Sequence, residues 1–284
     1  METLKPLYKV LPFEKYNTHY YRVDLSGSSE YLKNKYAGEK LEFPSVTNFL
    51  SIIGGQKTNG LMNWAVRESL SHVKTALCNH LEEKTIITND WIDNIFQEAK
   101  AVPEKLKNEA SDLGSMVHNA IDSYLKGVPQ DIDDKIKIPF NEFVKWFESS
   151  NLEVLMGDTP IANLEDRYGG RFDCLCFNKK TNKYVLIDLK TSNSIHDEMA
   201  LQVGAYCRGI VSTYGIAVGI PMDKDFDGVI VKIDKFEAVP PEIVKIKSLD
   251  EAYAVFCYAK DLKNALKGDL FDDYTKRVRK QNKL

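Results

Sequence analysis

Apolar residues recur along this chain with a helical period in its first half and in strand-like runs in its second half. Apolar positions three and four residues apart predict helices over 60–81, 89–100, 103–126 and 139–150. Further along, two β-type runs, 170–177 and 183–190, flank the polar segment Lys-Lys-Thr-Asn, which is typical of an antiparallel hairpin. A helix over 195–213, two strands over 216–221 and 228–234, and a final helix over 249–266 are expected after it.

The order of these elements predicts the fold class. Helices come first, followed by the hairpin, a crossover helix, two strands and a last helix, so we expect an α/β fold with a central mixed sheet between helices. The first 40 residues predict irregular structure with one short strand over 19–24, and Ser45 is expected to cap a short helix that ends at Gly54 and Gly55. We therefore divide one intimate domain into a mainly helical N-terminal lobe (1–150), an α/β core (151–268) and a basic tail (269–284).

The hairpin brings two carboxylates together. If its turn is centred between Lys180 and Thr181, Asp173 lies opposite Asp188, and Lys190 shares their face. The same face should also carry Leu175, Phe177 and Leu186, and the other face Phe172, Cys174, Cys176, Val185, Ile187 and Leu189. Strands that are apolar on both faces are covered by helices. Two facing carboxylates in such a place repel and are poorly solvated, so they call for a cation. Lys190 supplies one positive charge, and a divalent metal is the natural second.

The residues of this region match a family pattern. Gly-Arg-Phe-Asp at 170–173, Ile-Asp-Leu-Lys-Thr-Ser at 187–192 and a helix with Gln-Val-Gly-Ala-Tyr at 202–206 resemble the PD-(D/E)XK nuclease superfamily. The likeness is to its RecB-like exonuclease branch, which includes the mitochondrial genome maintenance exonuclease and related phage exonucleases. The resemblance implies a restriction-endonuclease-like core. It also implies that Asp173, Asp188 and Lys190 are catalytic and that the backbone carbonyl of Leu189 is a further metal ligand.

The implied cofactor is Mg²⁺ or Mn²⁺, as one or two ions. Asp173 and Asp188 offer the hard oxygen ligands that these ions prefer. Such ions stabilise the charge that builds up when a phosphodiester is hydrolysed, and they lower the pKa of an attacking water. Lys190 would orient that water and offset charge at the phosphate, whereas the sequence does not decide whether it acts as a base.

His118 is the next candidate ligand. Gly114 lies four residues earlier on the same helix face, and a mid-helix glycine costs roughly 1 kcal/mol relative to alanine, so something should approach closely there. A lone histidine is more often a satisfied core residue than a ligand. The Gly-x-x-x-His pattern, however, resembles the RecB-type histidine motif, which supplies a metal ligand. Beside Asp173, Asp188 and Lys190, we favour the ligand.

Three more residues are weaker candidates. Gln202 and Tyr206 are neighbours on one helix face. Each alone would be an ordinary packing residue, but together they resemble the Gln-x-x-x-Tyr motif, which is thought to contact DNA. Glu165 precedes Asp173 by eight residues and is a possible additional acidic ligand, with Asp166 as an equal competitor. The alternative for both carboxylates is a solvent-facing strand end.

The composition of the chain mainly excludes classes of protein. The chain has 284 residues, 43% of them hydrophobic, and no apolar run of the ~20 residues that a membrane span needs. Neither a signal peptide nor a transit peptide is recognisable.

The five cysteines indicate reduced thiols in a cytoplasm-like compartment. They lack the tight C-terminal group that holds an iron–sulfur cluster, so we expect no cluster. No P-loop is present in the sequence, so no nucleotide cofactor is expected. The net charge is −3, and the basic tail is more simply a solvated end than a phosphate contact.

The resemblance thus implies a metal-dependent DNA exonuclease that acts on DNA with a free end, in recombination, repair or replication. If it is phage-encoded, as the phage members of the family suggest, it would act in the host cytoplasm. A structure- or site-specific endonuclease is one alternative, because the same core serves both. A catalytically retired nuclease fold that only binds DNA or protein is another. Intact Asp173, Asp188 and Lys190 argue against the retired fold, and His118, Gln202 and Tyr206 favour the exonuclease.

Overall fold

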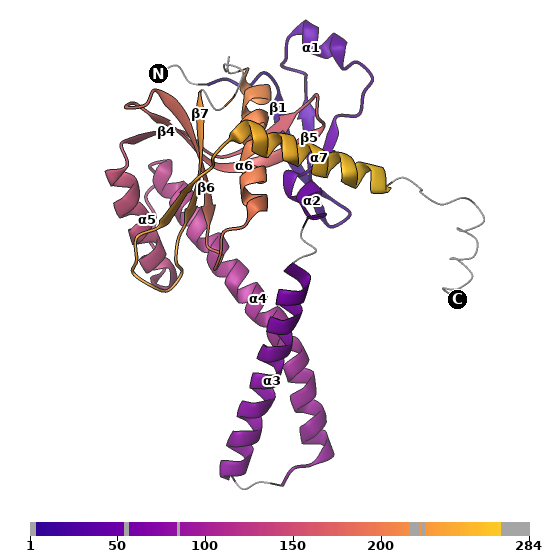
Figure 1. The fold of residues 1–284 in the computed structure, drawn as a ribbon, viewed down its shortest axis with the longest axis vertical. Coiled ribbons are helices and arrows are strands. Elements are labelled where there is room, and N and C mark those ends of the chain that lie inside the picture. The colour runs from indigo at the N-terminus through magenta and orange to yellow at the C-terminus, as the bar shows by residue number, and fades with distance from the viewer. Residues whose placement is uncertain (1–3, 54–56, 84–85, 216–221, 223–224, 268–284) are drawn as a thin grey trace, which may run out of the picture.

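The computed structural model describes residues 4–53, 57–83, 86–215, 222 and 225–267. Within them, the fold is α/β, with a five-stranded mixed sheet flanked by helices and a separate three-stranded sheet. Figure 1 shows a pair of long helices that projects away from the sheets. The expected fold class, a central mixed sheet between helices, is confirmed.

The central sheet has the strand order β4-β5-β6-β7-β8. Its strands are β4 (Leu152–Asn163), β5 (Tyr168–Asn178), β6 (Lys183–Lys190), β7 (Phe226–Lys232) and β8 (Glu242–Lys245). Only β6 and β7 pair in parallel, and α6 (Asp197–Tyr214) connects them. The short strand β8 was not predicted, and the strand expected over 216–221 falls outside the described residues.

Helices cover both faces of this sheet, as two continuous apolar faces require. One face packs against α6, α2 (Val46–Leu50) and α7 (Leu249–Lys267). The other packs against the C-terminal half of α4 (Asn89–Leu125) and against α5 (Lys137–Ser149), which follows a short 3₁₀ turn, Asp134–Ile136. The site described below therefore lies between α4 on one side and α6 on the other.

The predicted hairpin register is confirmed. The ladder of β5 and β6 runs from Cys174 opposite Ile187 to Asn178 opposite Lys183, which is the register that places the turn between Lys180 and Thr181. The ladder ends one pair before Asp173 and Asp188.

One predicted face is wrong. Phe172 packs with Leu175 against α6, whereas Cys174 packs on the α4 side. The alternation of faces is therefore interrupted at Asp173. Asp158, level with Asp173 on β4, has a φ of 28°, so both strands depart from regular geometry at the same point. Strict alternation assumes regular pleating, which these two strands lack here.

Helix α4 is one continuous helix of 37 residues, although two helices were predicted, ending and starting near Pro103. Proline has no N–H for the carbonyl four residues earlier, which usually ends or kinks a helix. Here that carbonyl belongs to Ala99, and Ser69 Oγ of α3 (Lys57–Glu83) donates to it at 2.8 Å. The neighbouring helix thus replaces the missing hydrogen bond, and α3 and α4 run side by side in the projecting pair (Figure 1).

The N-terminal segment is more regular than predicted. It forms an antiparallel sheet of β1 (Lys9–Lys15), β2 (Thr18–Asp24) and β3 (Glu42–Pro44), with α1 (Glu30–Lys35) between β2 and β3. Only β2 was expected. The predicted cap is confirmed, because Ser45 Oγ accepts from the N–H of Asn48 at 3.0 Å at the start of α2. That helix ends at Leu50, and the glycines predicted to end it fall outside the described residues.

Candidate active site

Asp173 lies where β5 separates from β6. Its Oδ2 accepts a hydrogen bond of 2.7 Å from the backbone N–H of Leu189. The regular ladder has ended one pair earlier, so the carboxylate takes the position of a strand carbonyl. A carboxylate bonded to a backbone N–H is held in one orientation and favoured in its charged form. Oδ1 of Asp173 therefore stays directed away from β6.

Asp188 is the most deeply buried acid of the group, with 2% of its surface exposed. Burial raises its pKa to about 6, the charge of Lys190 opposes this rise, and the charge of Asp173 adds to it. Oδ2 lies 2.5 Å from Lys190 Nζ, yet this buried oxygen accepts no well-formed hydrogen bond within the described residues. The cation beside this oxygen is already Lys190, through a contact of charges without hydrogen-bond geometry.

His118 faces the carboxylates from α4. Its Nδ1 lies 3.5 Å from Oδ1 of Asp173. Burial lowers the pKa of His118, but the hydrogen bond and charge of Asp173 outweigh it, so the net pKa is raised. Burial raises the pKa of Asp173, but His118, Lys190 and the N–H of Leu189 together hold it below its usual value. His118 and Asp173 thus favour each other's charged forms, and the helix supplies a nitrogen donor beside the hairpin.

Two further carboxylates, not identified from the sequence, line a small cavity at this point. The cavity has a volume of about 50 Å³ and is lined by His118, Asn119, Ile121, Asp122, Leu125, Asp158, Asp173 and Leu189. Asp122 lies one turn after His118, so its i+4 spacing was a signal that could have found it. Its Oδ1 is buried without a hydrogen bond among the described residues, while Oδ2 lies 2.6 Å from Lys126 Nζ. No spacing in the sequence identified Asp158 in this way. Its position opposite Asp173 depends on a register shift in β4 between Val154 and Met156, which regular strand pairing does not predict.

The donor set suits a hard divalent cation. His118 Nδ1 lies 3.5 Å from Asp173 Oδ1, and Asp188 lies beside Lys190 at the same end of the hairpin. Carboxylate oxygen suits Mg²⁺ and Mn²⁺, and imidazole nitrogen favours Mn²⁺ of the two. Within the part of the chain that the structure describes, no three acidic, histidine or cysteine side chains are gathered closely enough to form a complete ligand group. As the side chains stand, the ammonium of Lys190 neutralises Asp188.

Gln202 and Tyr206 lie on α6, on the other side of the sheet. Gln202 Nε2 donates to the Tyr206 hydroxyl at 2.7 Å, and the Tyr206 ring covers Gly170, where a Cβ would lie 2.4 Å from ring carbon Cε1. Burial raises the pKa of Tyr206 well above its usual value, and the charge of Asp188 adds to this. The two residues therefore form a hydrogen-bonded pair that packs against β5 near the carboxylates. Contact with DNA stays a prediction for both.

Glu165 does not join the group. It lies in the turn between β4 and β5, about 17 Å or more along the strand from Asp173 at roughly 3.3 Å per residue. Its Oε1 pairs with Lys35 Nζ at 2.9 Å, and its side chain is exposed. Its competitor, Asp166, accepts from the hydroxyl of Tyr253 in the same turn. Both carboxylates are therefore occupied by local partners at the far end of β5.

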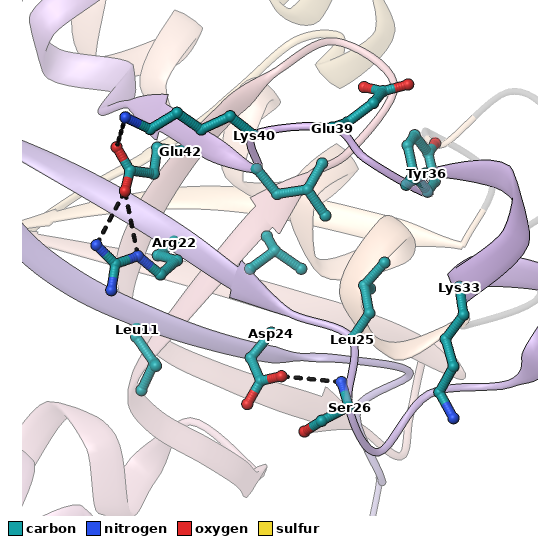
Figure 2. A pocket seen from close by; sticks show the side chains of 12 residues that line it. Leu11, Arg22, Asp24, Leu25, Ser26, Lys33, Tyr36, Glu39, Lys40 and Glu42 are labelled. Atoms are coloured by element: carbon teal, nitrogen blue, oxygen red, sulfur yellow. Dashed lines mark hydrogen bonds and ion pairs between the residues drawn. The ribbon is translucent and has the colours of Figure 1, made fainter.

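A larger hollow over the N-terminal sheet has no unbalanced charge to offer a ligand. Figure 2 shows that Arg22 and Lys40 both bond to the carboxylate of Glu42, at 2.9 and 3.1 Å. Asp24 accepts from the N–H of Ser26 at 2.8 Å. Lys33 and Glu39 pair with Glu30 and Arg167 outside the hollow, so its charged groups already have partners.

The cysteines are placed in different parts of the fold. Cys174 and Cys176 are buried side by side in the core, with their sulfurs 3.4 Å apart. The hydrogen bond with the neighbouring Cys176 thiol and burial together raise the pKa of Cys174 well above its usual value, so it stays a neutral thiol.

None of the described helices is long and apolar enough to cross a bilayer.

Comparison with known proteins identifies no family for this chain. No family model matches the chain, and no curated protein matches it. Among solved structures, it is similar to one titled "Crystal structure of SSO0001", with 16% identity over 76% of this chain and 89% of the other. The TM-score is 0.33, so this likeness carries no argument about fold or function.

Proposed function

We propose that this chain is a metal-dependent DNA exonuclease that hydrolyses phosphodiester bonds at DNA ends, in recombination, repair or replication in the cytoplasm. The observation that carries the proposal is the group at the ends of β5 and β6. Asp173 is oriented by the N–H of Leu189, and Asp188 is buried with its Oδ2 2.5 Å from Lys190 Nζ. The resemblance to RecB-like exonucleases supports the same conclusion through the same three side chains.

In this proposal, His118, Asp173, Asp188 and the carbonyl of Leu189 would hold the divalent cation. When bound, the cation would supply stabilisation of the developing phosphate charge and a more acidic water. The Leu189 N–H keeps Asp173 from rotating, and His118 approaches it from the other side. Lys190 contributes a fixed positive charge. Its ammonium is held by Asp188 at 2.5 Å and can donate to a phosphate oxygen without leaving the site.

Two substrates test the activity and its class. End-labelled linear DNA and covalently closed circular DNA are incubated in parallel with Mg²⁺ or Mn²⁺. The exonuclease should degrade linear DNA progressively from its ends and leave the closed circle intact. Two variants accompany the parent protein: Asp188→Asn, which should be inactive, and Asp131→Asn, an exposed aspartate outside both this cavity and the hairpin, which should be fully active.

The outcomes separate the three functional classes. Equal cleavage of circular and linear DNA would mean that the protein is an endonuclease and not an exonuclease. A folded parent protein that cuts neither substrate with either metal, but still binds DNA, would favour a retired nuclease fold. Normal cleavage by Asp188→Asn would remove the proposed site altogether.

A further inference from the structure

A second hollow meets the candidate active site at His118 and Asn119, which line both spaces. It is a groove of about 560 Å³ between α4, the loop after β6 and the segment after β7. Its lining residues are Lys107, Ala110, Ser111, Gly114, Ser115, His118, Asn119, Thr191, Ser192 and Lys235. The groove therefore runs along α4 from Lys107 toward the carboxylates.

The side chains that line this groove are suited to bind anions. It contains two lysines and four hydroxyl groups but no carboxylate, in a chain whose net charge is −3. Lysines and hydroxyl groups are the side chains that bind phosphate oxygens. Its only ring is the imidazole of His118, and no phenylalanine, tyrosine or tryptophan lines it for a base to stack on, so it suits the backbone of a nucleic acid rather than its bases.

Each lysine is placed so that its charge remains available. Lys107 is exposed and forms no ion pair with the rest of the described chain. Lys235 Nζ donates to the carbonyl of Ala110 at 2.8 Å, which is a neutral partner. Burial lowers the pKa of Lys235, a cost that a bound phosphate would offset.

Gly114 lets the loop after β6 pack closely against α4. An added Cβ there would lie 2.8 Å from Thr191 Oγ1, so a larger residue would force the Thr191 side chain to move. From Lys107 to His118 the helix rises about 16 Å at 1.5 Å per residue. That length matches several nucleotides, since phosphates of one strand are about 3.4 Å apart along a duplex axis.

We propose that this groove binds the sugar–phosphate backbone of the DNA strand that enters the active site, with Lys107 and Lys235 as its phosphate contacts. The inference rests on the proposed nuclease function and adds a binding track to it. The strand would pass Ser111, Gly114 and Ser115 and reach His118 with its reacting phosphate. Recognition would be independent of sequence.

Binding is measured separately from cleavage. In an Asp188→Asn background with EDTA, fluorescein-labelled single-stranded and duplex DNA are titrated between about 50 and 200 mM salt. The variant Lys107→Ala/Lys235→Ala is compared with Lys105→Ala/Lys180→Ala. The control pair removes the same charge from α4 and from the hairpin turn, outside the groove. Losing two phosphate contacts should lower the salt slope by about 1.4 for a single strand or 1.8 for a duplex, and the affinity roughly tenfold or more near 0.1 M salt. The control pair should change both much less.

Lys235 also ties its loop to α4, so Lys107→Glu, which breaks no described contact, serves as a second variant and should weaken binding by itself. Loss of affinity for either DNA form in the groove variants supports the proposal and tells which form the groove accepts. Unchanged affinity and slope for both forms would overturn it. Cleavage by the parent protein is scored independently. If the parent cleaves but the groove variants bind like the controls, only the groove is wrong. If the parent cleaves nothing but the groove variants still lose affinity, only the catalytic function is wrong.

Discussion

Replacing Asp188 by asparagine should stabilise the metal-free protein at neutral pH. The pKa of Asp188 is raised from 3.8 to about 6, chiefly by burial. Each pKa unit corresponds to 1.36 kcal/mol, so the ionised carboxylate costs the folded state about 3 kcal/mol. Asparagine resembles the protonated acid in shape and lacks the charge. Asp188→Asn should therefore raise the free energy of unfolding by up to about 3 kcal/mol, a figure that already contains the attraction of Lys190 because this attraction contributes to the pKa.

The pH dependence identifies the cause. An acid with a raised folded-state pKa binds its proton more tightly in the folded protein than in the unfolded one. Its contribution to stability is fully present below the unfolded value of 3.8 and is lost as the pH rises through about 6. The advantage of Asp188→Asn should thus be largest above about pH 7, shrink between about 6 and 4, and vanish below.

Urea unfolding in EDTA across this pH range measures the effect. Asp234→Asn is the matched control, because backbone N–H groups of Phe236 and Glu237 lower the pKa of Asp234. At neutral pH, Asp234→Asn should lower the free energy of unfolding, whereas Asp188→Asn should raise it. An Asp188→Asn protein that is no more stable than the parent at about pH 8, or whose advantage does not shrink on acidification, would refute the reasoning.

Three other variants test the fold and the site. Ser69→Ala should cost about 1–3 kcal/mol, since it leaves a buried helix carbonyl unpaired, but almost nothing in a Pro103→Ala background, where a helix N–H is restored. Gly170→Ala forces a Cβ against the Tyr206 ring and should cost about 1–3 kcal/mol in urea unfolding. His118→Ala should raise the Mn²⁺ concentration needed for cleavage and leave the metal-free melting temperature nearly unchanged, because the side chain is one-third exposed.

Each of these has its own contrary result. Equal costs of Ser69→Ala in both backgrounds would mean that Pro103 is tolerated for another reason. Gly27→Ala, whose new Cβ would have nothing within 4 Å, should leave stability unchanged, and an equal loss there would remove the steric explanation at Gly170. A destabilised His118→Ala protein with normal metal dependence would make His118 a core histidine.

The sequence predicted most where a short-range pattern decides the structure. The hairpin register followed from two β-type runs and a four-residue turn, and the structure has that register. Ser45 was recognisable as a cap from its position before a helix, and it is one. Both features depend on residues within a few positions of each other, so neighbouring sequence contains all the information that they need.

The predictions that failed concern features that depend on contacts between residues far apart in the sequence. Pro103 predicts a helix break unless Ser69, on another helix, is known to lie beside Ala99. Phe172 lies on the wrong predicted face because β5 becomes irregular at the residue that enters the site. Asp158 lines the cavity because the pairing register of β4 shifts, and no local sequence pattern predicts that shift.

Two glycines near the start of β5 also constrain how this sequence can diverge. An added Cβ at Gly169 would lie 2.4 Å from the Cβ of Tyr21, an atom that every residue except glycine keeps, so position 169 has little freedom to change. An added Cβ at Gly170 would instead lie 2.4 Å from the ring of Tyr206 on α6. In descendants of this chain, a larger residue at 170 should therefore persist only together with a smaller side chain at 206. These two positions should covary over evolutionary time, even though they lie 36 residues apart in the sequence.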